Sequence, residues 1–155
     1  MSHVNPYTGN YEGRIVAALM NWTDQNNGIA FGANVGFYLP NKAMRAPDAA
    51  WMSDEKWNSH SNEAKKKFLK EVPELVVEIV SPSDHPRVVA DKMTEWINNG
   101  ALLAWFVDPE KQVARVYRED GSMEEITDFE KGTLRGEDLL PGFEFELSRL
   151  YGRKP

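Results

Sequence analysis

The sequence predicts an α/β fold in which a mixed β-sheet is flanked by helices. Two observations support this prediction. Segments with apolar residues at helical spacing alternate with short apolar runs typical of strands, and Gly, Pro and Asn separate them along the whole chain. A buried strand over 75–80, a helix over 86–98 and a second buried strand over 102–107 also form a β-α-β unit. Such a unit is expected to make a right-handed crossover.

The amino-terminal half predicts one helix followed by a β-rich segment. A helix is expected over 11–25 and ends at Asn26-Asn27-Gly28. Its apolar residues at helical spacing are Ile15, Val16, Leu19 and Trp22. Short runs over 29–31, 35–39 and 48–52 are separated by Gly, Pro and Asn, which is typical of the strands of a meander.

The rest of the chain predicts the crossover unit and a closing segment. A short exposed helix is expected over 62–70, ahead of the strand at 75–80. The helix over 86–98 ends before Gly100 and carries an apolar face. Its members are Val88, Val89, Met93, Trp96 and Ile97. A strand is expected over 113–118, and the last third predicts an edge hairpin and a closing flap.

Length and composition indicate a single globular domain. The chain has 155 residues, 41% of them hydrophobic and 27% charged, which suits one domain over 1–155 with its own core. No apolar run approaches the length of a membrane span, and no signal peptide is evident. We therefore expect a cytoplasmic protein without a membrane partner. The absence of cysteine excludes disulfides and thiolate metal sites, so any metal must be held by oxygen or histidine.

Three acidic residues lie in or beside apolar segments. Glu78 interrupts the run over 75–80, where an ionised carboxylate costs several kcal/mol unless it is paired or binds a metal. Asp48 follows Pro47 at the start of a strand, and Glu12 lies on the apolar face of the first helix near its beginning. Each acid also has a structural interpretation. Asp48 could cap a turn, Glu12 could favour the helix dipole, and Glu78 could pair with one arginine.

Lys92 adjoins the apolar face of the helix over 86–98 and has two interpretations. Its stem could pack while its ammonium reaches water. Alternatively, Glu78 retreats from the end of its strand about as far as Lys92 retreats from the start of its helix, roughly 7 to 9 Å. The two side chains would then meet, and the lysine would balance the buried acid.

Several motifs in combination resemble a known nuclease family. They are Pro47-Asp48, Glu78-Ile79-Val80-Ser81-Pro82-Ser83-Asp84, Asp91-Lys92, Gly100, Trp105-Phe106-Val107-Asp108-Pro109 and Leu140-Pro141-Gly142-Phe143. Over roughly residues 10–147 the chain is similar to the Uma-type restriction endonucleases, a branch of the PD-(D/E)xK nuclease superfamily. The resemblance implies a restriction-endonuclease-like domain and metal-dependent cleavage of DNA phosphodiester bonds.

The resemblance also assigns roles to individual residues. Asp48 matches the acid of the Pro-Asp motif, Glu78 the acid of the (D/E)xK motif, and Glu12 the acid of the first helix. The lysine expected two residues after Glu78 is Val80 here. In this branch the following helix typically supplies the lysine, and Lys92 matches that position. The family usually carries an extra β-hairpin before the first helix, and we do not expect that hairpin in the sequence ahead of residue 11.

These roles describe a magnesium site. Mg²⁺, or Mn²⁺ in its place, prefers carboxylate and carbonyl oxygens, so Asp48, Glu78 and the Ile79 carbonyl are the expected ligands. The ion would lower the pKa of a water and neutralise charge on the phosphate. Lys92 would orient that water or stabilise the developing charge. Glu12 would position a second ion or the lysine.

DNA is the expected partner, although the formal net charge of −6 disfavours strong nonspecific binding to nucleic acid. The dense basic run of Lys65, Lys66, Lys67 and Lys70 could contact DNA or form a solvated helix face. Arg14, Arg45 and Arg87 are predicted to lie near the site. A homodimer is expected because so small a domain offers little groove for a duplex.

Two other functions stay open at this point. The first is an inactive binding or interaction module with the nuclease fold, favoured by the acidic composition and the missing lysine at position 80. The second is a metal-dependent hydrolase of another substrate. Histidine metal motifs, a nucleophile elbow and a glycine-rich phosphate loop are absent from the sequence.

Overall fold

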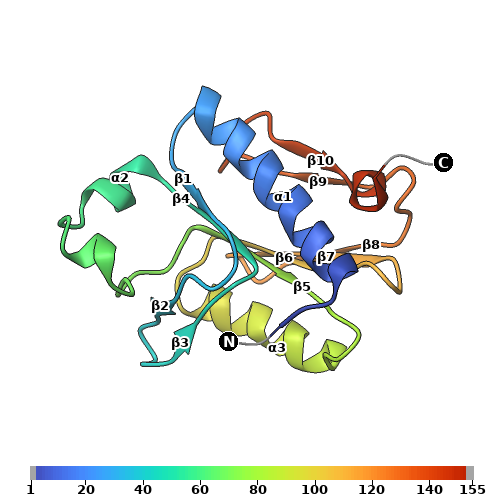
Figure 1. Cartoon of the computed structure of the whole chain (residues 1–155), viewed down its shortest axis with the longest axis horizontal. Coiled ribbons are helices and arrows are strands. Elements are labelled where there is room, and N and C mark those ends of the chain that lie inside the picture. The colour runs from blue at the N-terminus through green and yellow to red at the C-terminus, as the bar shows by residue number, and fades with distance from the viewer. Residues whose placement is uncertain (1–2, 153–155) are drawn as a thin grey trace.

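The computed structural model describes residues 3–152 (Figure 1). The helices are α1 (Pro6–Gln25), α2 (Asp54–Asn58) and α3 (Pro86–Asn98), with 3₁₀ turns η1 (Ala64–Lys66) and η2 (Leu147–Tyr151). The strands are β1 (Ile29–Phe31), β2 (Phe37–Tyr38), β3 (Met44–Arg45), β4 (Ala49–Met52), β5 (Leu75–Ile79), β6 (Leu103–Asp108), β7 (Val113–Arg118), β8 (Met123–Ile126), β9 (Thr133–Arg135) and β10 (Glu144–Glu146). Within the described residues, no helix is long and apolar enough to cross a membrane.

A mixed six-stranded sheet forms the centre of the molecule. Its order is β1-β4-β5-β6-β7-β8, and β2-β3 and β9-β10 form separate two-stranded sheets. The β5 and β6 strands are parallel, while the other neighbours in the large sheet are antiparallel. The α3 helix makes the crossover between the parallel pair, as the β-α-β pattern of the sequence predicts.

Two apolar layers cover the two faces of this sheet. Alternate residues of β5 enter them in turn: Val77 packs in the layer that includes α1, and Val76 packs in the layer that includes α3. The β9-β10 hairpin and η2 join the α1 layer, and Figure 1 shows them beside that helix. Residues on the even positions of β5 therefore face α3.

The first helix begins earlier than the apolar pattern indicates. Residues 6–10 supply little apolar periodicity, but the Asn5 side chain accepts a hydrogen bond from the Thr8 amide at 3.0 Å and Pro6 opens the first turn. Glu12 consequently lies in the second turn of α1 rather than near its beginning. The dipole interpretation of Glu12 is therefore wrong, because that effect falls off within the first turn.

The helix predicted over 62–70 is wrong except for the single turn of η1. Leu69 forms a bridge with Phe37, and its carbonyl accepts a hydrogen bond from the Tyr38 amide at 2.8 Å, which holds this part of the chain extended. The short β3 strand was not predicted. On α3, Val88 is 56% exposed, so it does not belong to the apolar face assigned to it.

Candidate active site

Asp48 and Glu78 lie where β4 begins and β5 ends. The strands are antiparallel, with Ala49 opposite Val77, so the residue before β4 comes next to the last residues of β5. Both acids occupy even positions and therefore share the face covered by α3. The fold thus brings together two acids that are thirty residues apart in the sequence.

Asp48 connects the two strands at this point. Its Oδ2 accepts a hydrogen bond from the Ile79 amide at 2.7 Å, while its own amide donates to the Val77 carbonyl at 3.0 Å. Burial raises the pKa of the Asp48 carboxyl group, and the hydrogen bond from Ile79 opposes that rise. One carboxylate oxygen of Asp48 is thereby fixed by the backbone of β5.

Glu78 is 7% exposed and has little to compensate its charge. Its Oε1 accepts one hydrogen bond, from Nε1 of Trp96 at 3.3 Å. Burial, followed by the charge of Asp48, raises the pKa of Glu78 to about 8, although Lys92 and the Trp96 hydrogen bond act in the opposite direction. The predicted pairing of Glu78 with an arginine is not observed among the described residues.

Glu12 reaches the same cluster from α1. Burial, the charge of Asp48 and a hydrogen bond with the Asp48 carboxyl group raise the pKa of Glu12 to about 7. The same hydrogen bond lowers the pKa of Asp48. Glu12 thus contacts Asp48 directly, and its expected role in positioning a second ion or the lysine stays a prediction.

Lys92 faces both acids from α3. It is half-buried, and its positive charge lowers the pKa of Asp48 and of Glu78. In the described part of the chain it forms no ion pair within 4.0 Å. The charge of Lys92 therefore acts on Glu78, but the expected direct pairing of the two side chains is not observed among the described residues. The cluster thus holds one lysine and three carboxyl groups, and when the three acids are ionised their charge exceeds that of the lysine.

Two neighbours of the cluster were missed by the sequence analysis. Asp84, in the loop after β5, raises the pKa of Asp48 and Glu78 through its charge. Trp96, which was assigned only to the core, donates the hydrogen bond to Glu78. The spacing of Lys92 and Trp96, one helical turn apart, was the available signal that the tryptophan shares the face of the lysine.

The arginines expected near the site do not neutralise it. Arg14 donates to the Asn10 side chain at 2.8 Å, and Nε of Arg45 is 2.6 Å from Oε1 of Glu95. Arg87 is exposed at the start of α3. Lys92 is therefore the cation whose charge acts on both Asp48 and Glu78.

The donor set suits a hard divalent cation. Two adjacent carboxyl groups with raised pKa values, and the carbonyl of Ile79 beside them, offer oxygen ligands of the kind that Mg²⁺ and Mn²⁺ prefer. Among residues 3–152, no three or more His, Asp or Glu side chains form a group that could itself hold a metal. The predicted set needs only two carboxylates, because a carbonyl and water complete the coordination of Mg²⁺.

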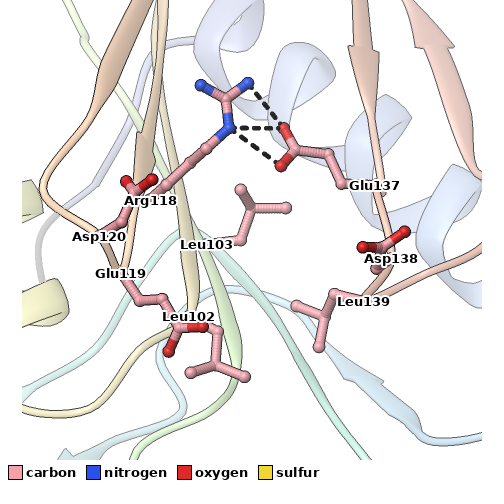
Figure 2. A pocket seen from close by; sticks show the side chains of 8 residues that line it. All are labelled: Leu102, Leu103, Arg118, Glu119, Asp120, Glu137, Asp138 and Leu139. Atoms are coloured by element: carbon pink, nitrogen blue, oxygen red, sulfur yellow. Dashed lines mark hydrogen bonds and ion pairs between the residues drawn. The ribbon is translucent and has the colours of Figure 1, made fainter.

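A different hollow, shown in Figure 2, lies at the other end of the sheet. Its volume is about 420 Å³, and it begins at Leu102 and Leu103, whereas Glu78 is opposite Phe106 further along β6. Its only cation among the described lining residues, Arg118, is paired with Glu137 at 2.8 Å. The remaining charged groups in this hollow are acidic, so it is a poor place for a phosphate.

Comparisons with known proteins give a family and a fold. The chain matches the Uma2 family, described as a putative restriction endonuclease, over residues 1–148. The crystal structure of a putative nuclease belonging to DUF820 from Anabaena variabilis has a TM-score of 0.82 at 15% identity, covering 97% of this chain and 83% of that one. This similarity confirms the predicted fold class.

A second solved structure, a DrdV–DNA complex determined by cryo-electron microscopy, is also similar. It has a TM-score of 0.49 at 10% identity, and the match covers 92% of this chain and 11% of that one. None of the curated proteins matches this sequence.

Proposed function

The chain belongs to the Uma2 family of putative restriction endonucleases, and on this premise we propose that it hydrolyses phosphodiester bonds of DNA with Mg²⁺ or Mn²⁺. One observation carries the proposal. Asp48 and Glu78 are adjacent and buried, and burial raises the pKa of both carboxyl groups, with the charge of Asp48 adding to the rise for Glu78. A divalent cation would supply the missing charge, and the phosphate would then meet it at the ends of β4 and β5.

In this proposal Asp48, Glu78 and the Ile79 carbonyl hold the ion. When bound, the ion acts as a Lewis acid on the phosphate and favours deprotonation of the attacking water. Glu78 must release its proton for the ion to bind. The hydrogen bond from the Ile79 amide fixes the orientation of Asp48 before the ion arrives.

Lys92 supplies the charge that Val80 cannot. Its ammonium acts on both acids from α3, which supports a role in orienting the water or balancing negative charge on the phosphate. Glu12 forms a hydrogen bond with Asp48, and its pKa is raised to about 7, so we assign it a positioning role. The homodimer and the cytoplasmic location expected from the sequence remain predictions.

Plasmid nicking with Mg²⁺ or Mn²⁺ tests this function. We expect cleavage by the wild type, and a loss of at least about 100-fold in Asp48→Asn and in Lys92→Met at matched folded fraction. Methionine keeps the stem of the lysine and removes its charge. Cleavage by Asp48→Asn at the rate of the wild type would refute the metal assignment.

The Lys92→Met variant also separates the nuclease from an inactive binding module. If the wild type cleaves and Lys92→Met cleaves equally well, the role of the lysine is wrong. If the wild type binds DNA but does not cleave it with either metal, the module with a lost activity is the better account.

A further inference from the structure

Positive charge is concentrated on one surface away from the carboxylate cluster. Six of the chain's ten lysines line two hollows of about 510 and 560 Å³ that adjoin the β2-β3 hairpin. They are Lys42, Lys56, Lys65, Lys66, Lys67 and Lys70. Because the whole chain has a formal charge of −6, this concentration departs strongly from the composition. We call these two hollows and the rings between them the lysine–aromatic surface.

The lysines of this surface are largely free to bind an anion. No acidic residue lines the first hollow among the residues that the structure describes, and Glu71 is the acid that lines the second. Lys56 pairs with Glu71 and with Glu74, but Lys66 and Lys67 form no ion pair within residues 3–152. A polyanion would neutralise these charges, which repel one another in its absence.

Two exposed aromatic rings separate the hollows. Phe68 lines the first hollow and is 52% exposed, and Tyr38 lines the second and is 40% exposed. Their ring centroids are 6.4 Å apart in an edge-to-face arrangement. Gly36 lies against the Phe68 ring, since a Cβ there would be 3.1 Å from Cδ1. The backbone thus supports the ring from one side and leaves the other side in solvent.

Lysines beside exposed rings match the chemistry of single-stranded nucleic acid. Phosphates attract the ammonium groups, and an unpaired base can stack on an aromatic side chain in a way that tolerates any sequence. A base inside a duplex is already stacked on its neighbours, so a ring on a protein surface cannot reach its face. Phe68 and Tyr38 therefore favour a single strand over a duplex.

This surface is within reach of a strand held at the carboxylate cluster. Arg45, which pairs with Phe37 in the β2-β3 hairpin, is three residues before Asp48, or roughly 10 Å along an extended chain. The second hollow includes Asn99, which follows α3 seven residues after Lys92, or roughly 10 Å along the helix axis, and Val72, which precedes Glu78 by six residues, or roughly 20 Å along an extended chain. Several nucleotides would span this gap.

We propose that the lysine–aromatic surface binds a single-stranded segment of DNA next to the bond that is cleaved. The identity of the ligand as DNA rests on the proposed nuclease function. The surface itself rests on the free lysines, the exposed rings and their place beside the cluster. It implies that the cleaved bond lies next to unpaired bases, which a locally melted segment of a duplex also offers.

Binding measurements on matched charge variants test the role of the lysines. Fluorescence anisotropy of a labelled twelve-nucleotide oligo-dT, in EDTA to prevent cleavage, compares Lys66→Gln/Lys67→Gln with Lys131→Glu, which changes the net charge equally. Lys131 is exposed just before β9 and lines neither hollow of the lysine–aromatic surface. We expect the double lysine variant, but not Lys131→Glu, to weaken binding several-fold. The same variant should reduce the slope of log K against log salt by about 1.4.

Phe68→Ala tests the stacking, with Met123→Ala as a control that removes another exposed apolar side chain. We expect Phe68→Ala to bind the single strand about five-fold or more weakly, and a duplex of the same length within two-fold of the wild type. Thermal melting of each variant confirms that the fold is retained.

Three results would overturn the proposal. They are equal effects of the double lysine variant and Lys131→Glu, equal loss of single-strand and duplex binding in Phe68→Ala, and tighter binding of oligo-U or polyglutamate than of oligo-dT. The outcome is separable from that of the nuclease proposal. Variant-specific loss of binding without any cleavage would refute the nuclease and keep the surface, whereas cleavage with unchanged binding would refute the surface and keep the nuclease.

Discussion

Two buried glutamates at the two ends of β5 differ sharply in what surrounds them. Glu74 precedes the strand and is 8% exposed, while Glu78 near its end is 7% exposed. Both oxygens of Glu74 accept hydrogen bonds from the Ser53 amide, at 3.2 and 3.3 Å, and Nζ of Lys56 is 3.8 Å from Oε1. Glu78 accepts one hydrogen bond from Trp96 and lies beside a second acid, Asp48.

The difference shows that burial alone does not mark a functional acid. Glu74 has the backbone amide and the cation that a buried carboxylate needs, so it serves the connection between β4 and α2. Glu78 lacks them, and its pKa of about 8 reflects that deficit. Such an unmet charge is costly to the fold and is expected where a ligand supplies the compensation.

The largest expected contrast between the two glutamates is in cleavage. With Mg²⁺ or Mn²⁺, we expect Glu78→Gln to lose at least about 100-fold in plasmid nicking, because the variant removes a charged ligand of the proposed ion. Glu74→Gln should cleave within about two-fold of the wild type per folded molecule. Similar losses in both variants would mean that Glu78 acts through stability only.

The next contrast is in the pH dependence of stability without metal. The folded protein keeps a proton on Glu78 up to about pH 8, whereas the unfolded chain releases it near pH 4.5. Hence the free energy of unfolding falls as pH rises between these values. We expect this fall, measured by urea unfolding in EDTA, to be smaller in Glu78→Gln by about 3 to 5 kcal/mol.

Glu74→Gln, which removes a buried carboxylate at the other end of β5, is the control for this measurement. The free energy of unfolding of Glu78→Gln should still fall somewhat with rising pH, because the pKa of Glu12 is also raised, to about 7. An unchanged fall in Glu78→Gln would contradict the assignment of a raised pKa to that group.

The smallest contrast is in stability at a single pH. In EDTA at pH 8 we expect Glu74→Gln to lower the free energy of unfolding by about 1 to 2 kcal/mol, because the Ser53 amide and Lys56 lose a charged partner. Glu78→Gln should leave it unchanged or raise it, since a costly buried charge is removed. Urea unfolding midpoints give both free energies of unfolding, provided that the slope against urea concentration is unchanged. Destabilisation of both variants would contradict the contrast between the two glutamates.

The sequence predicts the elements with strong periodicity and the acid that breaks a strand pattern. The helix over 86–98 and the strand over 113–118 have the predicted bounds, and Glu78 stands out because its neighbours are all apolar. The helix over 62–70 fails because the pairing of Leu69 with Phe37, distant in the sequence, overrides local preference.

The candidate site was predictable in its acids and in Lys92 but not in its hydrogen bonds. Asp48, Glu78 and Glu12 are found from local patterns and motif resemblance, but which hydrogen bonds each one makes depends on contacts between distant segments. The bond from the Ile79 amide to Asp48 and the bond from Trp96 to Glu78 are of this kind. The same limit applies to Glu74, whose compensation by Ser53 cannot be seen in the sequence around it.

The central claim is that Asp48 and Glu78 share a divalent cation that replaces a proton on Glu78. Titration calorimetry with Mn²⁺, in buffers of different ionisation enthalpy, counts the protons released on binding. We predict one bound ion and release of about one proton at pH 7, falling toward zero at pH 9, with the same behaviour in Glu74→Gln and no such binding in Glu78→Gln. Equal binding of Mn²⁺ by the wild type and Glu78→Gln, or binding without proton release at pH 7, would contradict the account.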